Sequence, residues 1–305
     1  MVLFSVSNRF IYAELVGGLG NQIFVFEMAQ YLSSLNNSKV FLNKFNVSQK
    51  HSGGSSDIGH YQLPNNTKFT NYGNIFNRFF NPVKRYLKHI NKLDQNFILV
   101  LDDTDINLNP NKILDLIRKR NPRLIIILGF WQDFSYWRDN LKYTLCDESE
   151  SFTIFSRELL EQHPVIFHYR LSTQYEDWEQ AWGILSPNFL NDALIALNVF
   201  KSSKAVNLWI FSNNVDMARY LLKNYVSGEH LNIRFIDDSE LSPAEVIMLL
   251  SKSQFLICSN STFSIVAAKI GNVPNVVVPS DLSKKSSGIT LTSNKWIRVN
   301  SSWLQ

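Results

Sequence analysis

Cysteine is scarce in this chain, and long apolar runs are missing. The 305 residues contain two cysteines, Cys146 and Cys258, which lie far apart and match no metal-binding spacing. This excludes a disulfide-stapled scaffold and fits a reducing compartment. No stretch of about 20 uncharged apolar residues is present, so we expect no transmembrane helix. Residues 1–10 lack a basic start and a small-residue cleavage site, and we therefore predict no signal peptide.

A large excess of one charge is also missing. The 30 Lys and Arg residues nearly balance 26 Asp and Glu residues, which leaves a net charge of +4. This mild value disfavours a dedicated nucleic-acid-binding protein and suits a partner that carries phosphates or an anionic membrane surface. One basic cluster, residues 78–92, interleaves Lys and Arg with Phe and Tyr. It is typical of an amphipathic patch on a membrane or, with more weight, of a helix with a solvated basic face.

Apolar segments of strand length alternate with helical segments along the chain. We expect strands at residues 11–16, 97–101, 123–129, 165–170, 205–211, 233–236, 255–258 and 276–279, with helices between most of them. This alternation predicts an α/β fold with parallel sheets and crossover helices. The break at Pro164 predicts two domains, residues 1–162 and 163–305. Residues 36–74 are rich in Asn, Ser and Gly and predict a long irregular excursion with one strand at 39–42.

A glycine-rich turn, Gly17-Gly18-Leu19-Gly20-Asn21-Gln22, lies between the first strand and the first helix. Neither the dinucleotide pattern nor a P-loop is present, because the third glycine of the former and the Lys-Ser/Thr ending of the latter are missing. Glycine allows a close approach of backbone to a ligand, and the first N–H groups of a helix bind anions. The alternative is an ordinary tight turn. Asn21 and Gln22 favour the first interpretation, because two amides at a helix mouth are placed to reach outward.

Three polar clusters follow predicted strands in the second half. They are His168-Tyr169-Arg170, then Ser212-Asn213-Asn214, and then Ser259-Asn260-Ser261-Thr262-Phe263-Ser264. In open α/β sheets, ligands bind beyond the carboxyl ends of the strands. An arginine there offers a bidentate fork for phosphate, and a helix N-terminus adds free N–H groups. The alternatives are surface polar residues at a strand end and ordinary helix caps.

Acidic residues give a competing prediction. Asp102, Asp103 and Asp105 follow one strand, and Asp237 and Asp238 follow another. Such a pair can hold a divalent cation that bridges a diphosphate. If Arg170 neutralises the diphosphate, no metal is needed. We therefore favour a solvated turn for residues 102–105 and predict no metal site.

Taken in order, these segments resemble the α-1,2-fucosyltransferases of glycosyltransferase family 11, especially the bacterial surface-polysaccharide members. The matching segments are Gly17-Gly18-Leu19-Gly20-Asn21-Gln22-Ile23-Phe24, Gly129-Phe130-Trp131-Gln132, His168-Tyr169-Arg170, Leu185-Ser186-Pro187, Phe211-Ser212-Asn213-Asn214 and Ser259-Asn260-Ser261-Thr262-Phe263-Ser264. The resemblance implies a GT-B architecture, in which two Rossmann-like domains face a cleft. It also implies inverting, metal-independent transfer of fucose from GDP-β-L-fucose to the 2-hydroxyl of a galactose or related residue on a glycan.

The resemblance assigns roles residue by residue. Arg170, His168 and Asn21 would be catalytic, and Arg170 would hold the diphosphate while His168 supports Arg170 or the donor. The donor would bind Arg170, Ser212, Asn213, Asn214, Asn260, Ser261, Thr262 and Ser264. The acceptor side would comprise Gly18, Gly20, Asn21, Gln22, Trp131 and Gln132. Acceptor specificity would lie in residues 36–74.

The same resemblance places the protein in O-antigen or lipopolysaccharide synthesis. The acceptor would be a β-galactoside glycan carried on a lipid, and no nucleic acid would be a partner. The protein would be cytoplasmic, with a peripheral contact to the inner membrane as an option.

Departures from the family pattern leave alternatives open. Leu171 replaces a second arginine, Asn213-Asn214 replaces an aspartate pair, and Ile265-Val266 replaces two tryptophans. No obvious carboxylate base remains, so either Glu176 or Asp177 substitutes, or the leaving group departs early and the acceptor proton leaves late. An accessory protein that binds a nucleotide sugar without catalysis, and a transferase with another donor sugar, are the two other candidates.

Overall fold

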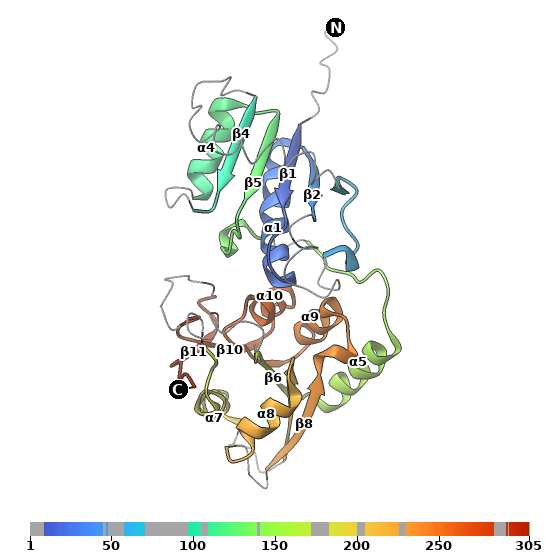
Figure 1. Ribbon diagram of the computed structural model, residues 1–305, viewed down its shortest axis with the longest axis vertical. Helices are drawn as coiled ribbons and strands as arrows, with labels where there is room; N and C mark the ends of the chain where they lie inside the picture. Colours follow the sequence, from blue (N-terminus) through green and yellow to red (C-terminus); the bar gives the residue numbers. More distant parts are fainter. Residues whose placement is uncertain are drawn as a thin grey trace. The chain divides into compact units, whose positions relative to one another are not determined.

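The computed structural model describes residues 9–44, 47, 58–70, 97–104, 109–138, 141–171, 183–199, 205–225, 230–283, 291 and 293–304 (Figure 1). The chain forms two compact units, Met1–Lys142 and Tyr143–Gln305. The basic cluster at 78–92 lies outside the described residues, as do Asp105, Glu176 and Asp177. Among the described residues, no helix is both long enough and apolar enough to span a bilayer.

The N-terminal unit contains a five-stranded sheet in the order β3-β2-β1-β5-β4, and every neighbouring pair is parallel. Its strands are β1 (Phe10–Glu14), β2 (Lys39–Asn43), β3 (Thr67–Thr70), β4 (Ile98–Asp102) and β5 (Leu124–Leu128). Its helices are α1 (Leu19–Asn36) and α4 (Pro110–Arg120), with short 3-10 turns η1 (Ile58–His60) and η2 (Phe134–Tyr136). Strand β3 and turn η1 fall in the part of the sequence for which we predicted an irregular excursion.

Helix α1 begins at Leu19, so Gly20, Asn21 and Gln22 form its first turn rather than a loop before it. The helix is buried on nearly all sides, and even Glu27 is 1% exposed. Gly18 is the N-cap residue and no side chain caps the helix there. The turn that carries the glycines is therefore short and lies directly at the carboxyl end of β1.

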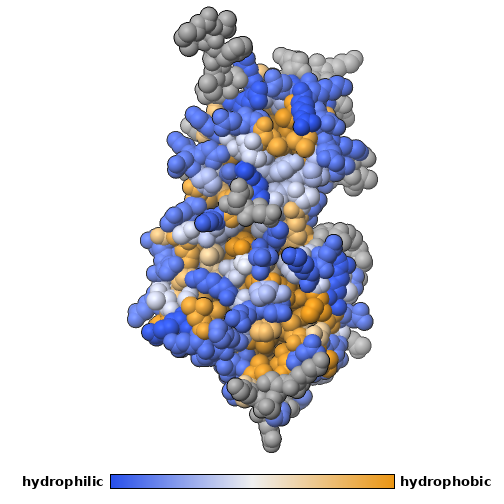
Figure 2. All heavy atoms as spheres, turned by 180° about the vertical axis from the view of Figure 1, so that it is seen from behind, coloured by the Kyte–Doolittle hydropathy of each residue, from blue (hydrophilic) through white to orange (hydrophobic). Residues whose placement is uncertain are grey.

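The C-terminal unit contains a six-stranded sheet in the order β11-β10-β9-β6-β7-β8, again with parallel neighbours. Its strands are β6 (Val165–Tyr169), β7 (Val206–Ser212), β8 (Leu231–Asp237), β9 (Phe255–Ile257), β10 (Asn275–Pro279) and β11 (Ile297–Val299). Its helices are α5 (Glu150–Gln162), α7 (Pro187–Ala196), α8 (Val215–Leu222), α9 (Pro243–Ser251) and α10 (Thr262–Ile270), with the 3-10 turn η4 (Asp238–Glu240). Figure 2 shows the molecule from behind, and hydrophobic residues are visible on this side of the C-terminal unit.

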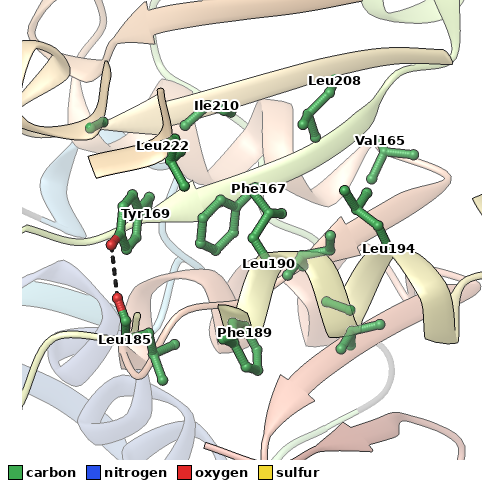
Figure 3. Packing of buried hydrophobic residues seen from close by; sticks show 14 of the residues in the cluster. Val165, Phe167, Tyr169, Leu185, Phe189, Leu190, Leu194, Leu208, Ile210 and Leu222 are labelled. Carbon is green, nitrogen blue, oxygen red and sulfur yellow. Dashed lines mark hydrogen bonds between the residues drawn. The ribbon is translucent and has the colours of Figure 1, made fainter. Parts of the chain in front are cut away.

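Alternate residues of β6 enter different layers of the C-terminal unit. Val165, Phe167 and Tyr169 join a buried cluster with residues of α7 and α8 (Figure 3). The Tyr169 hydroxyl donates to the Leu185 carbonyl over 2.8 Å. His168 points to the other face, because its ring stacks on Phe263 of α10 with centroids 5.1 Å apart. The period-2 geometry of a strand thus separates the hydrophobic core from the polar side of β6.

The domain boundary predicted at residues 162 and 163 lies about one helix too late, because α5 belongs to the C-terminal unit. Phe155 of α5 packs edge-on against Trp209 of β7. Arg234 of β8 bonds Glu158 of α5 over 2.5 Å, and α5 also packs against α9. Pro164 ends α5 as expected, but a helix can end inside a domain as well as between two domains.

Candidate functional site

The three polar clusters of the C-terminal unit follow neighbouring strands. Strand β6 lies between β7 and β9, and the carboxyl ends of parallel neighbours share one edge of the sheet. The chain runs outward from β6 through β7 to β8 and then returns to β9 on the other side of β6. This reversal makes the β6–β9 junction a topological switch point, the place where open α/β sheets bind ligands. The predicted clusters therefore follow three adjacent strands, β7, β6 and β9, at an edge of the sheet suited to binding.

Arg170 and the N-terminus of α10 flank this switch point. Arg170 is the first residue after β6, and its side chain is exposed. Helix α10 begins at Thr262, and the N-cap residue Ser261 accepts from the Phe263 N–H over 3.3 Å. A guanidinium fork and a helix N-terminus both favour negative charge. Both groups are therefore of a type that suits an anionic ligand such as a diphosphate.

His168 lies in β6, two residues before Arg170, and is 2% exposed. Its Nδ1 is 3.4 Å from the Ser259 hydroxyl oxygen. Burial, and to a lesser extent the nearby positive charge of Arg170, lower the pKa of His168 to about 3. The imidazole is therefore neutral at physiological pH. Of the two roles expected for it, this placement fits support of Arg170 better than contact with a donor.

The buried imidazole predicts acid-sensitive stability. The unfolded chain binds a proton on His168 near pH 6.5 and the folded chain only near pH 3. The stabilisation is thus fully present above pH 6.5 and is lost as the pH falls toward 3, by about 1.4 kcal/mol per pH unit. We expect the free energy of unfolding in urea to fall more steeply for the wild type than for His168→Gln between pH 7 and pH 4. A difference between the two proteins that does not change with pH would contradict a neutral buried His168.

Two of the serines expected to bind the donor are buried. Ser212 is 0% exposed, and its hydroxyl oxygen accepts from the Asn214 N–H over 3.2 Å. Ser264 is also 0% exposed, and its hydroxyl donates toward the Ser261 carbonyl at 3.5 Å. Neither side chain reaches the surface, so both fit a role in shaping the turns rather than in contacting a donor.

The amides of the expected donor site are bound within the protein. Asn214 is the N-cap of α8 and accepts from the Met217 N–H over 3.0 Å. Asn260 donates to the Gly183 carbonyl over 3.0 Å and fixes the turn between β9 and α10. Asn213 contacts both backbone polar groups of Leu171. Arg170, Ser261 and Thr262 also lie at this sheet edge and are at least partly exposed.

A second candidate site occupies the N-terminal unit. Strands β1 and β5 are parallel neighbours, so the glycine turn after β1 and residues 129–132 after β5 share one sheet edge. The Gln132 side-chain amide donates to the Asn21 side-chain oxygen over 2.8 Å. Two residues that are 111 positions apart in the chain and were both expected on the acceptor side thus meet there.

The glycines of this edge have different roles. Gly17 has a φ of +67°, which disfavours any residue with a side chain. Gly18 has an ordinary φ of −71° and is exposed, and a Cβ atom added to it would meet no atom within 4 Å. The fold itself therefore does not require glycine at position 18. The open space beside its backbone is available to a ligand.

Three residues expected on the acceptor side are buried instead. Gly20 lies inside the first turn of α1. Gln22 is 0% exposed, because its amide donates to the Gly17 carbonyl over 3.0 Å and its oxygen accepts from the Ile58 N–H over 3.2 Å. Trp131 is 4% exposed, and its indole N–H donates to the Leu128 carbonyl over 2.8 Å. The side chains of Gln22 and Trp131 hold the edge together and do not face outward.

Phe130 is the exposed aromatic residue of the segment after β5, with 44% of its surface accessible, and we did not include it among the predicted site residues. Asp103 fixes this arrangement. Its carboxylate accepts from the Phe130 N–H over 2.5 Å and from the Trp131 N–H over 3.3 Å. Gly129, with φ +96°, turns the chain out of the strand. Strand alternation no longer applies after such a turn, so the sequence could not decide which aromatic ring points outward.

The carboxylates of the acidic turn at the end of β4 accept hydrogen bonds from groups within the N-terminal unit. Asp102 accepts from both the N–H and the hydroxyl of Thr104, at 3.1 and 2.7 Å, while Asp103 holds the segment after β5. No group of three or more His, Cys, Asp or Glu side chains in the described part of the chain could hold a metal ion. The expectation of metal-independent chemistry stays a prediction.

Comparisons with known proteins bear on the fold. No protein-family model matches the sequence, and no curated protein matches it. Among solved structures, a mutant of Arabidopsis thaliana FUT1 in complex with GDP is similar, with a TM-score of 0.54 and 10% identity over 89% of this chain and 70% of that chain. Fucosyltransferase NodZ from Bradyrhizobium is similar, with a TM-score of 0.50 and 14% identity over 88% of this chain and 94% of that one.

At these identities the likeness is one of fold. The α/β architecture predicted from the sequence, with parallel sheets in both halves of the chain, is confirmed. Membership of glycosyltransferase family 11 and α-1,2 specificity stay expectations of the sequence. The chain has the GT-B-type fold of fucosyltransferase structures.

Proposed function

We propose that this protein is a glycosyltransferase that uses GDP-fucose. The observation that carries the proposal is the exposed Arg170 beside the N-terminus of α10 at the β6–β9 switch point. A nucleoside diphosphate sugar presents a diphosphate that such a site would bind. The GT-B-type fold, which this chain shares with a GDP complex of FUT1 and with fucosyltransferase NodZ, supports the choice of donor.

Arg170 supplies the main catalytic effect in this proposal. As the bond between the sugar carbon and the diphosphate oxygen breaks, negative charge develops on the departing GDP. A guanidinium that is already in place stabilises this charge without reorganising, and losing one such donor typically costs about 10²- to 10³-fold in rate. His168 is buried and neutral, and it links the end of β6, next to Arg170, to Ser259 by a hydrogen bond and to Phe263 by ring stacking.

The acceptor would bind at the edge of the N-terminal unit. Asn21 and Gln132 form a hydrogen-bonded pair there, and the exposed Gly18 in the same turn has open space at its Cβ position. The acceptor hydroxyl attacks the sugar carbon from the side opposite the departing GDP, which inverts the configuration. Its proton leaves late, to water or to the departing diphosphate, because the early departure of GDP makes the carbon reactive before a strong base is required.

The finer assignments rest on the sequence motifs. We propose transfer to the 2-hydroxyl of a galactose or related residue on a β-galactoside glycan, without a metal, in the synthesis of a surface polysaccharide. A lipid-linked acceptor and a peripheral contact with the inner membrane complete the proposal.

A different donor sugar is the second candidate. Asn213 replaces an aspartate of the family pattern, and its amide is bound to the backbone of Leu171. A changed residue at the donor edge is compatible with changed donor contacts. The same change would fit an accessory protein that binds the donor without transferring it.

Competition between nucleotides tests the donor assignment. We expect GDP to inhibit transfer from GDP-fucose and UDP, at the same concentrations, to have little effect. Calorimetric titration with GDP, UDP and GDP-fucose gives the corresponding affinities. Tighter binding of UDP than of GDP would overturn the guanosine assignment. Tight GDP-fucose binding without transfer to any glycan would favour the accessory protein.

A further inference from the structure

Asn213 follows β7 and lies opposite the residue that follows Arg170. Its side-chain oxygen accepts from the Leu171 N–H over 2.9 Å, and its amide nitrogen donates to the Leu171 carbonyl over 2.9 Å. The last paired residues of the two strands are Tyr169 and Ser212. The side chain of Asn213 therefore extends the β6–β7 ladder beyond its last backbone pair.

With these two bonds, the backbone is held in place on both sides of Arg170. On one side, Tyr169 is held by the pairing with Ser212 and by its hydroxyl bond to the Leu185 carbonyl. On the other side, Leu171 is 0% exposed in the core cluster, and its backbone is bound by Asn213. The exposed Arg170 thus stands between two residues whose backbones are fixed.

We propose that Asn213 is a positioning residue for Arg170, acting through the backbone of Leu171 rather than through contact with the donor. This inference rests on the proposed function, because it needs Arg170 to bind the diphosphate. The role requires an amide at position 213. A carboxylate offers acceptors only, so it would accept from the Leu171 N–H but would face the Leu171 carbonyl without a donor. The aspartate of the family pattern could not form this pair of bonds.

A double-mutant cycle on GDP binding tests the inference. Asn213→Ala removes both bonds to the Leu171 backbone and should weaken GDP binding about tenfold. Asn213→Asp keeps only the bond from the Leu171 N–H and should weaken GDP binding by a smaller factor. Arg170→Ala should weaken it more. Because Asn213 acts through Arg170, adding Asn213→Ala to Arg170→Ala should cause almost no further loss. Asn109→Asp, at the N-cap of α4, is the matched control, since a cap needs only an acceptor and GDP binding should not change.

Additive losses in the cycle would overturn the inference, because they would mean that Asn213 acts on GDP independently of Arg170. The hydrogen-bond pair has its own readout without any ligand. Exchange of the Leu171 amide proton, followed by NMR, should speed up about tenfold or more in Asn213→Ala, and unchanged exchange would contradict the pair. If the wild type binds no GDP while this exchange result holds, the proposed function fails and the role of Asn213 in donor binding fails with it.

Discussion

Replacing Arg170 with alanine is expected to reduce fucose transfer by about 10²-fold or more while the protein stays folded. The magnitude is that of losing one preorganised charge donor to a developing oxyanion. Folding should survive because Arg170 is exposed at the end of β6 and belongs to no core cluster of the described residues. Steady-state kinetics with GDP-fucose measures the transfer rate, and thermal unfolding shows whether the variant is folded.

Arg157→Ala is the matched control for this experiment. Arg157 is an exposed arginine of α5, where alanine is a good helix former, so the net charge changes equally without touching the strand ends. Its transfer rate should equal that of the wild type. Near-normal transfer by a folded Arg170→Ala protein would remove Arg170 from the mechanism.

Gly18→Ser should raise stability slightly and lower transfer strongly. Serine is a preferred N-cap residue, and the Cβ atom it adds meets no protein atom within 4 Å, so the melting temperature should not fall. The same side chain would occupy the open space at Gly18 in which we place part of the acceptor. Displacing a reacting hydroxyl by about 1 Å costs on the order of 10²-fold, and we expect a loss of that size in kcat/KM for the acceptor.

The affinity for GDP separates this effect from a general disturbance. It should stay unchanged in Gly18→Ser, because the donor edge belongs to the other unit. Asn109→Ser changes the N-cap of α4 in the same unit as Gly18 and should leave transfer intact. Transfer at the wild-type rate by Gly18→Ser would show that no substrate approaches this glycine.

The sequence predicted where the polar clusters meet, and the reason is geometric. Parallel strands end at a common edge, so residues that follow strands gather whatever their separation in the chain. This brought Arg170 next to the turn before α10, and Asn21 next to Gln132. The α/β class followed from alternation alone, because apolar strand-length runs between helices have few other arrangements.

Side-chain direction could not be predicted with the same success. Gln22 and His168 are polar, yet both are buried and hydrogen-bonded, because each side chain finds its partner inside the unit. Trp131, which we expected on the acceptor side, is buried, and Phe130 is exposed instead, because Gly129 interrupts the strand. The boundary was misplaced because only tertiary packing ties α5 to Trp209 and Arg234. Each of these outcomes depends on contacts between distant segments.

The most direct test of the proposed function is incubation of the purified protein with GDP-fucose and a panel of β-galactoside acceptors, in the absence of added metal and with a chelator present. We expect release of GDP and formation of a fucosylated acceptor by the wild type and by Arg157→Ala, with about 10²-fold less product from Arg170→Ala. Equal product from wild type and Arg170→Ala would contradict the site. No product from any acceptor, together with no measurable GDP binding, would contradict the function.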